Sequence, residues 1–399
     1  MRLHLLPLII LLAINAGIDL YIYRAIRQRC RWKGASVVQA VTAVALLIMV
    51  IVTISLPRRS GSDATLLTVM WLLFGYFSVY IPKFLFFIFD LLARIPRLWH
   101  SRRAKWLSMS GVVIAVACFV GLWWSALVTR TSLHVNEVTI EIPDLPERFE
   151  GYRIVQFSDA HVGTYASDTT FIHKAVERIN ALGGDLIVFT GDIVNMRSDE
   201  LVPHVAPLSR LHAPDGVYSI LGNHDYGDYS EWSSPEAKQA NMELLYSLQR
   251  RSGLTLLRDT TVMLRRGNDS IALIGVENIG DPPFPTYGSL RRAYPDASDK
   301  VTKILLSHNP MHWSDSIADN PNNNIALTLA GHTHAMQCEL FGWSPAKYRY
   351  PLWGGLYHSS DGRQLYVNIG LGAVGVPVRI GQAVPEITVI TLTRSNTDQ

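Results

Sequence analysis

Long apolar stretches dominate the first 130 residues of this 399-residue chain. Four of them, at 3–23, 36–56, 65–92 and 109–128, reach about the 20 residues that a helix needs to cross a bilayer. No small-residue cleavage site follows the first stretch, so we do not expect a removed signal peptide. The third stretch is long and carries Pro82, Lys83 and Asp90, which predicts a kink or an early exit from the hydrocarbon. Residues 1–130 are therefore predicted to form a transmembrane region with four helices.

The pattern changes after residue 130. Residues 133–142 alternate between apolar and polar positions like a strand, within a juxtamembrane strand and linker at 131–150. Farther along, short apolar runs end abruptly in polar residues, and helical patterns at 170–182 and 236–251 lie between some of them. Strands that alternate with helices predict a layered α/β sandwich over 151–399. Such folds place their chemistry at the carboxyl ends of strands.

The charge distribution predicts how the chain crosses the membrane. Residues 1–130 hold 15 Lys and Arg but only 3 acids, whereas the rest holds 21 and 30. The loops at 24–33 and 94–105 carry five Lys or Arg each, while the middle loop offers only Arg58 and Arg59 and the N-terminal tail only Arg2. Because basic loops stay in the cytoplasm, both ends of the region face outward. We expect a bacterial inner or plasma membrane, with the domain after residue 130 on the periplasmic or extracellular side.

Four further expectations follow from charge and cysteine usage. The outer domain is too acidic for a nucleic-acid partner. Asp19 and Lys83 both fall within predicted spans, and we expect them to form an ion pair, with separate snorkelling to the interface as the alternative. Cys30, Cys118 and Cys338 fall in a cytoplasmic loop, a span and the outer domain, so no structural disulfide is expected. Cys338 is interpreted as a small buried residue rather than a redox switch.

Polar residues with metal-binding chemistry stand where the apolar runs end. They are carboxylates, imidazoles and one carboxamide, with no thiolate, which suits a pair of divalent ions such as Mn²⁺, Fe²⁺ or Zn²⁺. Two pairs are spaced two residues apart, so both members of a pair can point the same way from an extended strand end. In order, the residues are Asp159, His161, Asp192, Asn223, His224, Asp225, His308, His332 and His334.

This ordered set resembles the calcineurin-like metallophosphoesterase family. The stretch from Gly331 through Leu392, with Gly-Leu-Gly at 370–372, is most similar to its transmembrane and exported bacterial members. The resemblance implies a four-layer α/β/β/α sandwich behind the transmembrane region. It further implies that one ion is bound by Asp159, His161 and His334. The other ion is bound by Asn223, His308 and His332, with Asp192 bridging the two.

The resemblance also assigns the residues around the phosphate. His224 matches the histidine that donates a proton, and Asn223 and His224 match residues that contact the substrate. We expect the neighbouring Asp225 to orient His224. Arg379 and Tyr357 are further candidates for substrate contact, although surface or packing roles are preferred for both.

Two departures from the family pattern bear on activity. Many members have an acid three residues after the bridging aspartate, where this chain has Asn195, and a lower pKa of the His224 imidazolium is one expected consequence. Relatives of this subtype usually have two glycines after the second histidine pair, where this chain has Ala335 and Met336. Bulkier groups there are expected to narrow access to the phosphate.

The sequence thus predicts a membrane-anchored, metal-dependent phosphoesterase that uses two-metal hydroxide attack. Its substrate is expected to be a phosphate mono- or diester, with lipid-linked compounds and nucleotide sugars as candidates, because some membrane-associated relatives cleave a nucleotide-diacylsugar pyrophosphate. The alternative is a catalytically weakened receptor or scaffold that binds metal and a phosphorylated ligand. Only Asn195 and the Ala335-Met336 pair support that alternative. Substrate, metal identity and oligomeric state stay open.

Overall fold

A computed structural model describes residues 5–32, 34–57, 59, 63–100, 102–282, 284–296 and 298–394. The chain divides into two compact units, of which one comprises Met1–Gly61 with Thr68–Leu127 and the other Ser62–Leu67 with Val128–Gln399. Three of the basic residues used to predict orientation, Arg2, Lys33 and Arg58, lie outside the described residues.

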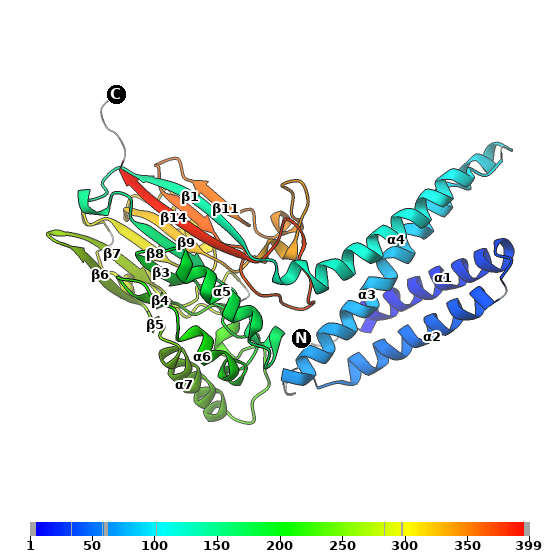
Figure 1. Cartoon of the computed structure of the whole chain (residues 1–399), viewed down its shortest axis with the longest axis horizontal. Helices are drawn as coiled ribbons and strands as arrows, with labels where there is room; N and C mark the ends of the chain where they lie inside the picture. Colours follow the sequence, from blue (N-terminus) through cyan, green and yellow to red (C-terminus); the bar gives the residue numbers. More distant parts are fainter. Residues whose placement is uncertain are drawn as a thin grey trace. The chain divides into compact units, whose positions relative to one another are not determined.

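The first unit contains helices long and apolar enough to cross a membrane, as predicted. They are α1 (Leu5–Arg29), α2 (Gly34–Ser55), α3 (Asp63–Leu92) and α4 (Lys105–Leu127), and a short 3₁₀ helix, η1 (Ile95–Trp99), follows α3 (Figure 1). Most of their apolar side chains are exposed or only partly buried, which suits helices surrounded by lipid. Helix α1 continues six residues past its predicted end into the basic segment, and α3 passes through Pro82 without ending.

Two buried carboxylates organise the polar contacts of these helices. The predicted pair is confirmed, because Lys83 Nζ lies 2.7 Å from Asp19 Oδ1. Gln39 Nε2 and the Tyr80 hydroxyl also donate to Asp19, at 2.8 and 2.7 Å. The second carboxylate, Asp90, is fully buried and accepts from groups on α1 and on α4 with the segment before it. Its donors are Tyr21, Arg29, Arg103 and Ser108, and Arg94 is an additional ion-pair partner.

The second unit is built on two six-stranded sheets (Figure 1). The first has the order β1-β14-β2-β3-β4-β5, with β1 (His134–Ile142), β2 (Arg153–Phe157), β3 (Leu186–Phe189), β4 (Val217–Ser219), β5 (Thr255–Leu256) and β14 (Glu386–Arg394). The second has the order β11-β12-β9-β8-β7-β6, with β6 (Thr260–Arg266), β7 (Asp269–Gly275), β8 (Lys303–Leu306), β9 (Ile325–Ala330), β11 (Gly355–His358) and β12 (Gln364–Val367). Strands β2 to β5 are parallel, as are β7, β8, β9 and β12, so their carboxyl ends share an edge within each sheet.

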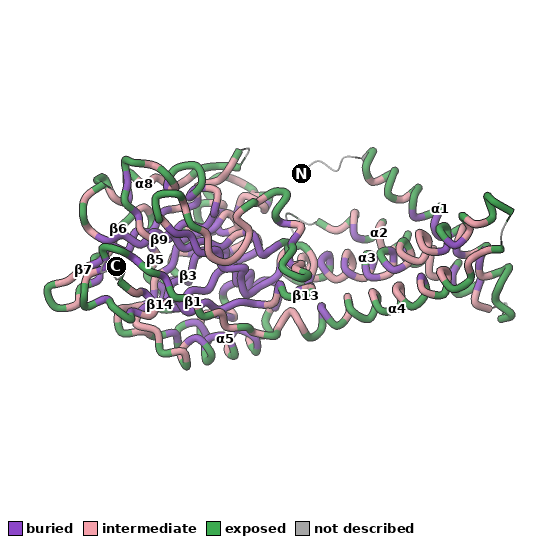
Figure 2. Tube along the Cα trace, turned by 90° about the horizontal axis from the view of Figure 1, so that it is seen from above, coloured by how far each residue is buried: buried purple, intermediate pink, exposed green. Residues whose placement is uncertain are grey.

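Successive side chains of a strand face opposite layers of the sandwich. In β14, Ile387 and Val389 pack with helix side chains, whereas Ile390 and Leu392 enter the core between the two sheets, as a period of two requires. Helices α5 (Thr170–Ala181), α6 (Val205–Leu208) and α7 (Pro235–Arg251) cover the first sheet. The second sheet is covered more thinly, by α8 (Leu290–Ala293) and the turn at Trp313–Ile317. Figure 2 shows the buried strands inside the exposed outer elements, which confirms the α/β/β/α sandwich.

Local sequence explains where the helices of this unit begin. Ser234 accepts the backbone N–H of Ala237, and Pro235 occupies the first position of α7, where its missing N–H costs nothing. Asp168 accepts the N–H of Thr170 at the start of α5. On α5, Ile172, Val176 and Ile179 recur at helical spacing and are buried against the first sheet.

The ion pair between α1 and α3 gives a first testable prediction. Lys83→Met leaves the Asp19 carboxylate buried without its cation, and we expect a loss of stability on the order of 3 kcal/mol. Thermal unfolding of the detergent-solubilised full chain, followed by circular dichroism, measures the change. Lys105→Met, at the first residue of α4, is the control. Equal midpoints for Lys83→Met and the wild type would contradict a stabilising pair.

Candidate metal centre

The predicted residues follow the carboxyl ends of five parallel strands from both sheets. Asp159 and His161 follow β2, Asp192 follows β3, and Asn223 and His224 begin a 3₁₀ turn after β4. His308 follows β8, and His332 and His334 follow β9. The loops that carry these side chains therefore meet at one edge of the two sheets, although the residues lie up to 175 positions apart in the sequence.

The structure places the seven predicted ligands in two adjoining groups. In each group the possible ligand atoms all lie within 4.8 Å of one another: Asp159, His161 and His334 in one, and Asp192, His308 and His332 in the other. Asp192 Oδ2 lies 3.2 Å from His308 Nε2 and 3.6 Å from His161 Nε2, so it stands between the groups. Asn223 Oδ1 lies 3.2 Å from His308 Nε2 and completes the second group.

The donor set fits divalent cations. The Nε2 atoms of His161 and His334 lie 3.1 Å apart, and both imidazoles are buried. Burial lowers the pKa of His161 to about 3 and the pKa of His334 well below its ordinary value, so both are neutral at physiological pH. Two neutral imidazoles that turn their Nε2 atoms toward each other beside a carboxylate form a ligand set for a cation.

Groups around the histidines fix which nitrogen faces the centre. His308 Nδ1 lies 2.7 Å from the carbonyl oxygen of Thr190, so it donates there and turns Nε2 toward the centre. His332 Nε2 lies 3.0 Å from the Tyr350 hydroxyl, which leaves Nδ1 for the centre. In metal-binding histidines, the nitrogen that does not bind the metal is usually hydrogen-bonded to a second group. That group sets both the ring orientation and the basicity of the ligand nitrogen.

The buried carboxylates carry opposite pKa shifts. Burial raises the pKa of Asp159 to about 7, and the charge of Asp192 adds to that rise. For Asp192, burial is outweighed by the neighbouring His308 and His224, and its pKa falls well below the ordinary value. His308 shows the reverse balance, because Asp192 overcomes burial and raises its pKa to about 9. The negative charge is therefore centred on Asp192, beside the positively charged His308.

The backbone at the centre is strained in a consistent way. Five of the seven predicted ligands have a left-handed φ, between 41° and 78°: Asp159, His161, Asp192, His332 and His334. Such conformations are uncommon outside glycine and cluster at functional sites. Two glycines beside the predicted ligands are required for space. A Cβ at Gly222, before Asn223, would lie 2.1 Å from Asp192 Oδ1, and one at Gly331, before His332, would lie 2.5 Å from Asp159 Oδ2.

The expected role of Asp225 needs correction. Its fully buried carboxylate accepts the backbone N–H groups of Asp192, Ile193, Val194 and Gly222, at 2.9 to 3.2 Å, and not the ring of His224. Instead, His224 Nδ1 donates to the backbone carbonyl of Asn195 at 2.6 Å. Asp225 therefore fastens the loops after β3 and β4 together, and the Asn195 main chain orients His224.

The structure shows the hydrogen bonds of the Asn195 side chain, which the sequence could not. Its side chain turns away from His224, with Nδ2 donating to Thr164 Oγ1 at 3.3 Å and Oδ1 lacking a hydrogen-bond partner among the described residues. Among the described residues, the side chain therefore has no hydrogen bond to His224. The expected effect of a neutral residue on the His224 pKa rests on a contact that the structure does not contain.

A second tyrosine orients the candidate phosphate-binding residues. Asn223 Nδ2 donates to the Tyr229 hydroxyl at 2.8 Å, which turns Oδ1 toward the centre. The Tyr229 ring also stacks on His224, with centroids 4.3 Å apart. Neither Tyr229 nor Tyr350 was singled out from the sequence, because no motif carries them.

The remaining candidates have packing roles. Arg379 is completely buried and donates to the carbonyls of Ile369, Gly370 and Gly372, with Nη2 also 3.3 Å from His334 Nδ1. Burial lowers its pKa to about 10, so it keeps its charge at neutral pH. The Tyr357 hydroxyl accepts backbone N–H groups of Trp353 and Gly354. Cys338 is half-buried rather than fully buried.

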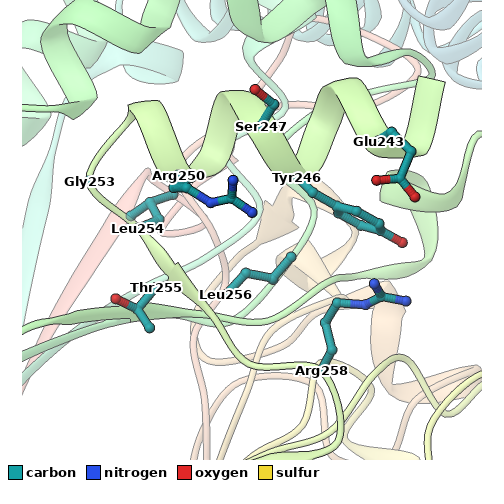
Figure 3. A pocket seen from close by; sticks show the side chains of 9 residues that line it. All are labelled: Glu243, Tyr246, Ser247, Arg250, Gly253, Leu254, Thr255, Leu256 and Arg258. Atoms are coloured by element: carbon teal, nitrogen blue, oxygen red, sulfur yellow. The ribbon is translucent and has the colours of Figure 1, made fainter. Parts of the chain in front are cut away.

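A hollow of about 670 Å³ lies between α7 and the segment that leads into β5 (Figure 3). None of the nine residues that line it is a predicted ligand. One of its charged groups already has partners, since Arg258 lies 4.3 Å over the Tyr246 ring and forms an ion pair with Glu277. This hollow is separate from the predicted metal centre.

Two sheets that deliver carboxylates and imidazoles to one edge define a dinuclear phosphoesterase fold. Sequence profiles agree: "Calcineurin-like phosphoesterase" matches residues 152–336, and "Probable Calcineurin-like phosphoesterase, transmembrane domain" matches residues 1–130. The chain belongs to the calcineurin-like metallophosphoesterase family, in the branch whose members carry a transmembrane domain, and is a phosphoesterase hydrolase.

Three relatives illustrate the similarity. The uncharacterized metallophosphoesterase YkuE of Bacillus subtilis is 33% identical over 74% of this chain and 99% of its own length. A transmembrane protein with metallophosphoesterase domain from Danio rerio is 30% identical over 80% of this chain and 72% of its own. The UDP-2,3-diacylglucosamine pyrophosphatase LpxG of Chlamydia trachomatis is 28% identical over 54% of this chain and 74% of its own.

The hydroxyl behind His332 provides a second prediction. Tyr350→Phe removes the partner of Nε2 and frees the ring to turn, so we expect Mn²⁺ affinity to fall about 10- to 100-fold. Calorimetric titration of the metal-stripped full chain measures the affinity. Tyr348→Phe, which alters an exposed tyrosine two residues earlier, is the matched control. Unchanged affinity in Tyr350→Phe would exclude an orienting role.

The residues that replace the family's two glycines provide a third prediction. Ala335 and Met336 have φ values of 50° and 46°, a conformation that glycine adopts without cost. Met336→Gly is therefore expected to stabilise the protein by about 0.5–1 kcal/mol. Met263→Gly, at a similarly exposed methionine in β6 without a positive φ, is the control and is expected to destabilise. Thermal unfolding distinguishes the two, and a destabilised Met336→Gly protein would refute strain at this turn.

Proposed function

We propose that this protein hydrolyses a phosphate mono- or diester at a dinuclear metal centre on the outer face of its membrane. The observation that supports this proposal most strongly is the position of Asp192 between two ligand groups, 3.2 Å from His308 and 3.6 Å from His161. Asp159, His161 and His334 would hold one ion, and Asn223, His308 and His332 the other, with Asp192 shared. Such a pair supplies a nucleophile at neutral pH and neutralises phosphate oxygens. Mn²⁺, Fe²⁺ and Zn²⁺ all suit these ligands.

His224 is the proposed proton donor. Because Nδ1 donates to the Asn195 carbonyl, Nε2, at the other side of the ring, is the nitrogen from which a proton would be donated. Stacking on Tyr229 holds the ring plane, and the His224 backbone N–H donates to Asp192 Oδ1 at 2.8 Å. The ring is thereby fixed beside the shared carboxylate, where it can protonate a leaving oxygen. Asn223 and His224 are the proposed substrate contacts.

The proposed substrate is lipid-linked or a nucleotide sugar, carried at or near the membrane. The transmembrane region supports this class, because it confines the domain to the neighbourhood of a bilayer. The name of the Chlamydia relative, a UDP-2,3-diacylglucosamine pyrophosphatase, gives a precedent for a substrate that combines nucleotide and acyl chains. The basic loops before α2 and before α4 favour a domain that faces outward, which argues against a cytoplasmic substrate.

A fourth prediction tests this chemistry. The full chain in detergent is expected to hydrolyse bis(p-nitrophenyl) phosphate with Mn²⁺, and chelation abolishes turnover. His224→Gln is expected to lower kcat about 10²- to 10⁴-fold while the bound Mn²⁺ stays constant, because it removes the proton donor and no ligand. Asp192→Asn is expected to abolish metal-dependent turnover. Near-normal turnover in Asp192→Asn would end the proposal.

The same assay addresses the receptor or scaffold alternative. That alternative rests on the Ala335-Met336 pair, whose second member exposes 45% of its surface directly after a predicted ligand. Tight binding of a phosphorylated ligand to the metal-loaded chain, without turnover of any p-nitrophenyl ester, would favour it.

A further inference from the structure

The segment that leaves the metal centre after His334 exposes a cluster of large apolar side chains. We call residues 338–348 the aromatic hairpin. Phe341 is 100% exposed and Tyr348 79%, and Leu340 and Trp343 expose 44% and 40% of their surfaces. Folding alone does not explain this composition, because each of these residues leaves apolar surface in contact with water.

The turn at the tip makes the exposure of Phe341 more unusual. The backbone groups of Leu340 and Trp343 exchange hydrogen bonds of 2.9 and 3.0 Å around a two-residue loop. Both loop residues, Phe341 and Gly342, have positive φ values of 54° and 74°. The first position of such a turn favours asparagine, aspartate or glycine. A phenylalanine there is unfavourable for the backbone and for solvation, which points to a role outside the fold.

The base of the aromatic hairpin is firmly held. Ser344 and Ala346 are completely buried, and Ser344 Oγ donates to the Ala335 carbonyl at 2.6 Å. Gln382 connects both sides of the turn, since its N–H donates to the Glu339 carbonyl and its Oε1 accepts from Gly342. The tip is therefore a fixed projection.

The chemistry of the tip matches a bilayer interface. Trp343 and Tyr348 pack edge to face, with centroids 6.3 Å apart, and Lys347 Nζ lies 5.8 and 5.5 Å from their rings. Tryptophan, tyrosine and a neighbouring lysine are the residues that anchor proteins at the headgroup level. Residues 340–348 contain no acid, although this part of the chain is acidic as a whole.

A bilayer is also within reach of this domain. Only residues 128–133 separate the end of α4 from the start of β1, and six residues span at most about 20 Å. In the sequence, residues of the predicted metal centre stand on both sides of the aromatic hairpin. The predicted ligand His334 precedes it, and Tyr350, whose hydroxyl contacts His332, follows it. Both ends of the aromatic hairpin therefore start at the predicted metal centre.

We propose that the aromatic hairpin inserts into the interface of the membrane in which the protein is anchored, and so brings the metal centre to phosphate groups at headgroup level. The substrate class that follows is an amphiphilic phosphoester whose acyl or alkyl chains remain in that membrane. This last step rests on the proposed function, whereas insertion of the tip does not.

Insertion is tested by fluorescence in lipid nanodiscs. Phe341→Cys is labelled with an environment-sensitive nitrobenzoxadiazole dye in a full chain whose Cys30, Cys118 and Cys338 are replaced by alanine. We expect a blue-shifted emission and at least twofold quenching by nitroxide-labelled phosphatidylcholine. The same dye at Met263→Cys, an exposed position in β6, is expected to show neither. Equal, weak quenching at both positions would overturn insertion. The same result is expected if a second copy of the chain or another protein covers the tip, so that outcome also contradicts the proposal.

The substrate class is tested with two chromogenic diesters that differ only in their alkyl group. We expect ethyl p-nitrophenyl phosphate to be a poorer substrate than hexadecyl p-nitrophenyl phosphate by at least 10-fold in kcat/KM in nanodiscs. In the double variant Phe341→Asp, Trp343→Asp this preference is expected to fall about 10-fold. A preference that is unchanged in the double variant would contradict the proposal. Absence of turnover with both esters would contradict the proposed function, and quenching would still decide insertion.

Discussion

Holding two carboxylates inside a protein next to five imidazoles is the constraint on which the rest of this domain depends. Asp159 and Asp192 expose 0% and 1% of their surfaces, and a buried charge is costly unless it is paired. Backbone N–H groups meet part of that cost, since His332 donates to Asp159 and His224 donates to Asp192. Of the imidazoles, His308 supplies one positive charge, because Asp192 raises its pKa to about 9, whereas burial keeps His161 and His332 neutral. The pair of divalent cations that we propose would satisfy the remainder.

The scaffold makes that arrangement possible through main-chain contacts. Asp225, a further buried carboxylate, binds N–H groups of three consecutive residues after β3 and of Gly222 after β4. Arg379 has the corresponding role at the second sheet. Its guanidinium donates hydrogen bonds to carbonyls of the turn at 369–372 and lies against His334. The two groups together hold the strained loops from which the predicted ligands project, and both act within the low dielectric of the interior.

The sequence predicted what depends on local pattern. Runs of about 20 apolar residues gave the helices of the membrane unit, and the pairing of Asp19 with Lys83 followed from the cost of burying either charge alone. The ligand candidates were found because each stands where an apolar run ends, and parallel strands deliver those ends to one edge. The roles of Asp225, Tyr229, Tyr350 and Arg379 could not be predicted, since their contacts are to main-chain groups or to distant side chains. The boundaries of the domains and the roles of the ligands remain predictions.

Sharing of Asp192 between two ions is tested most directly by anomalous diffraction from crystals of the full chain loaded with Mn²⁺, recorded at the manganese absorption edge. Two peaks are predicted about 3.5–4 Å apart, one beside Asp159, His161 and His334, the other beside Asn223, His308 and His332, with the Asp192 carboxylate touching both. A single peak, or two peaks without Asp192 between them, would contradict the dinuclear centre.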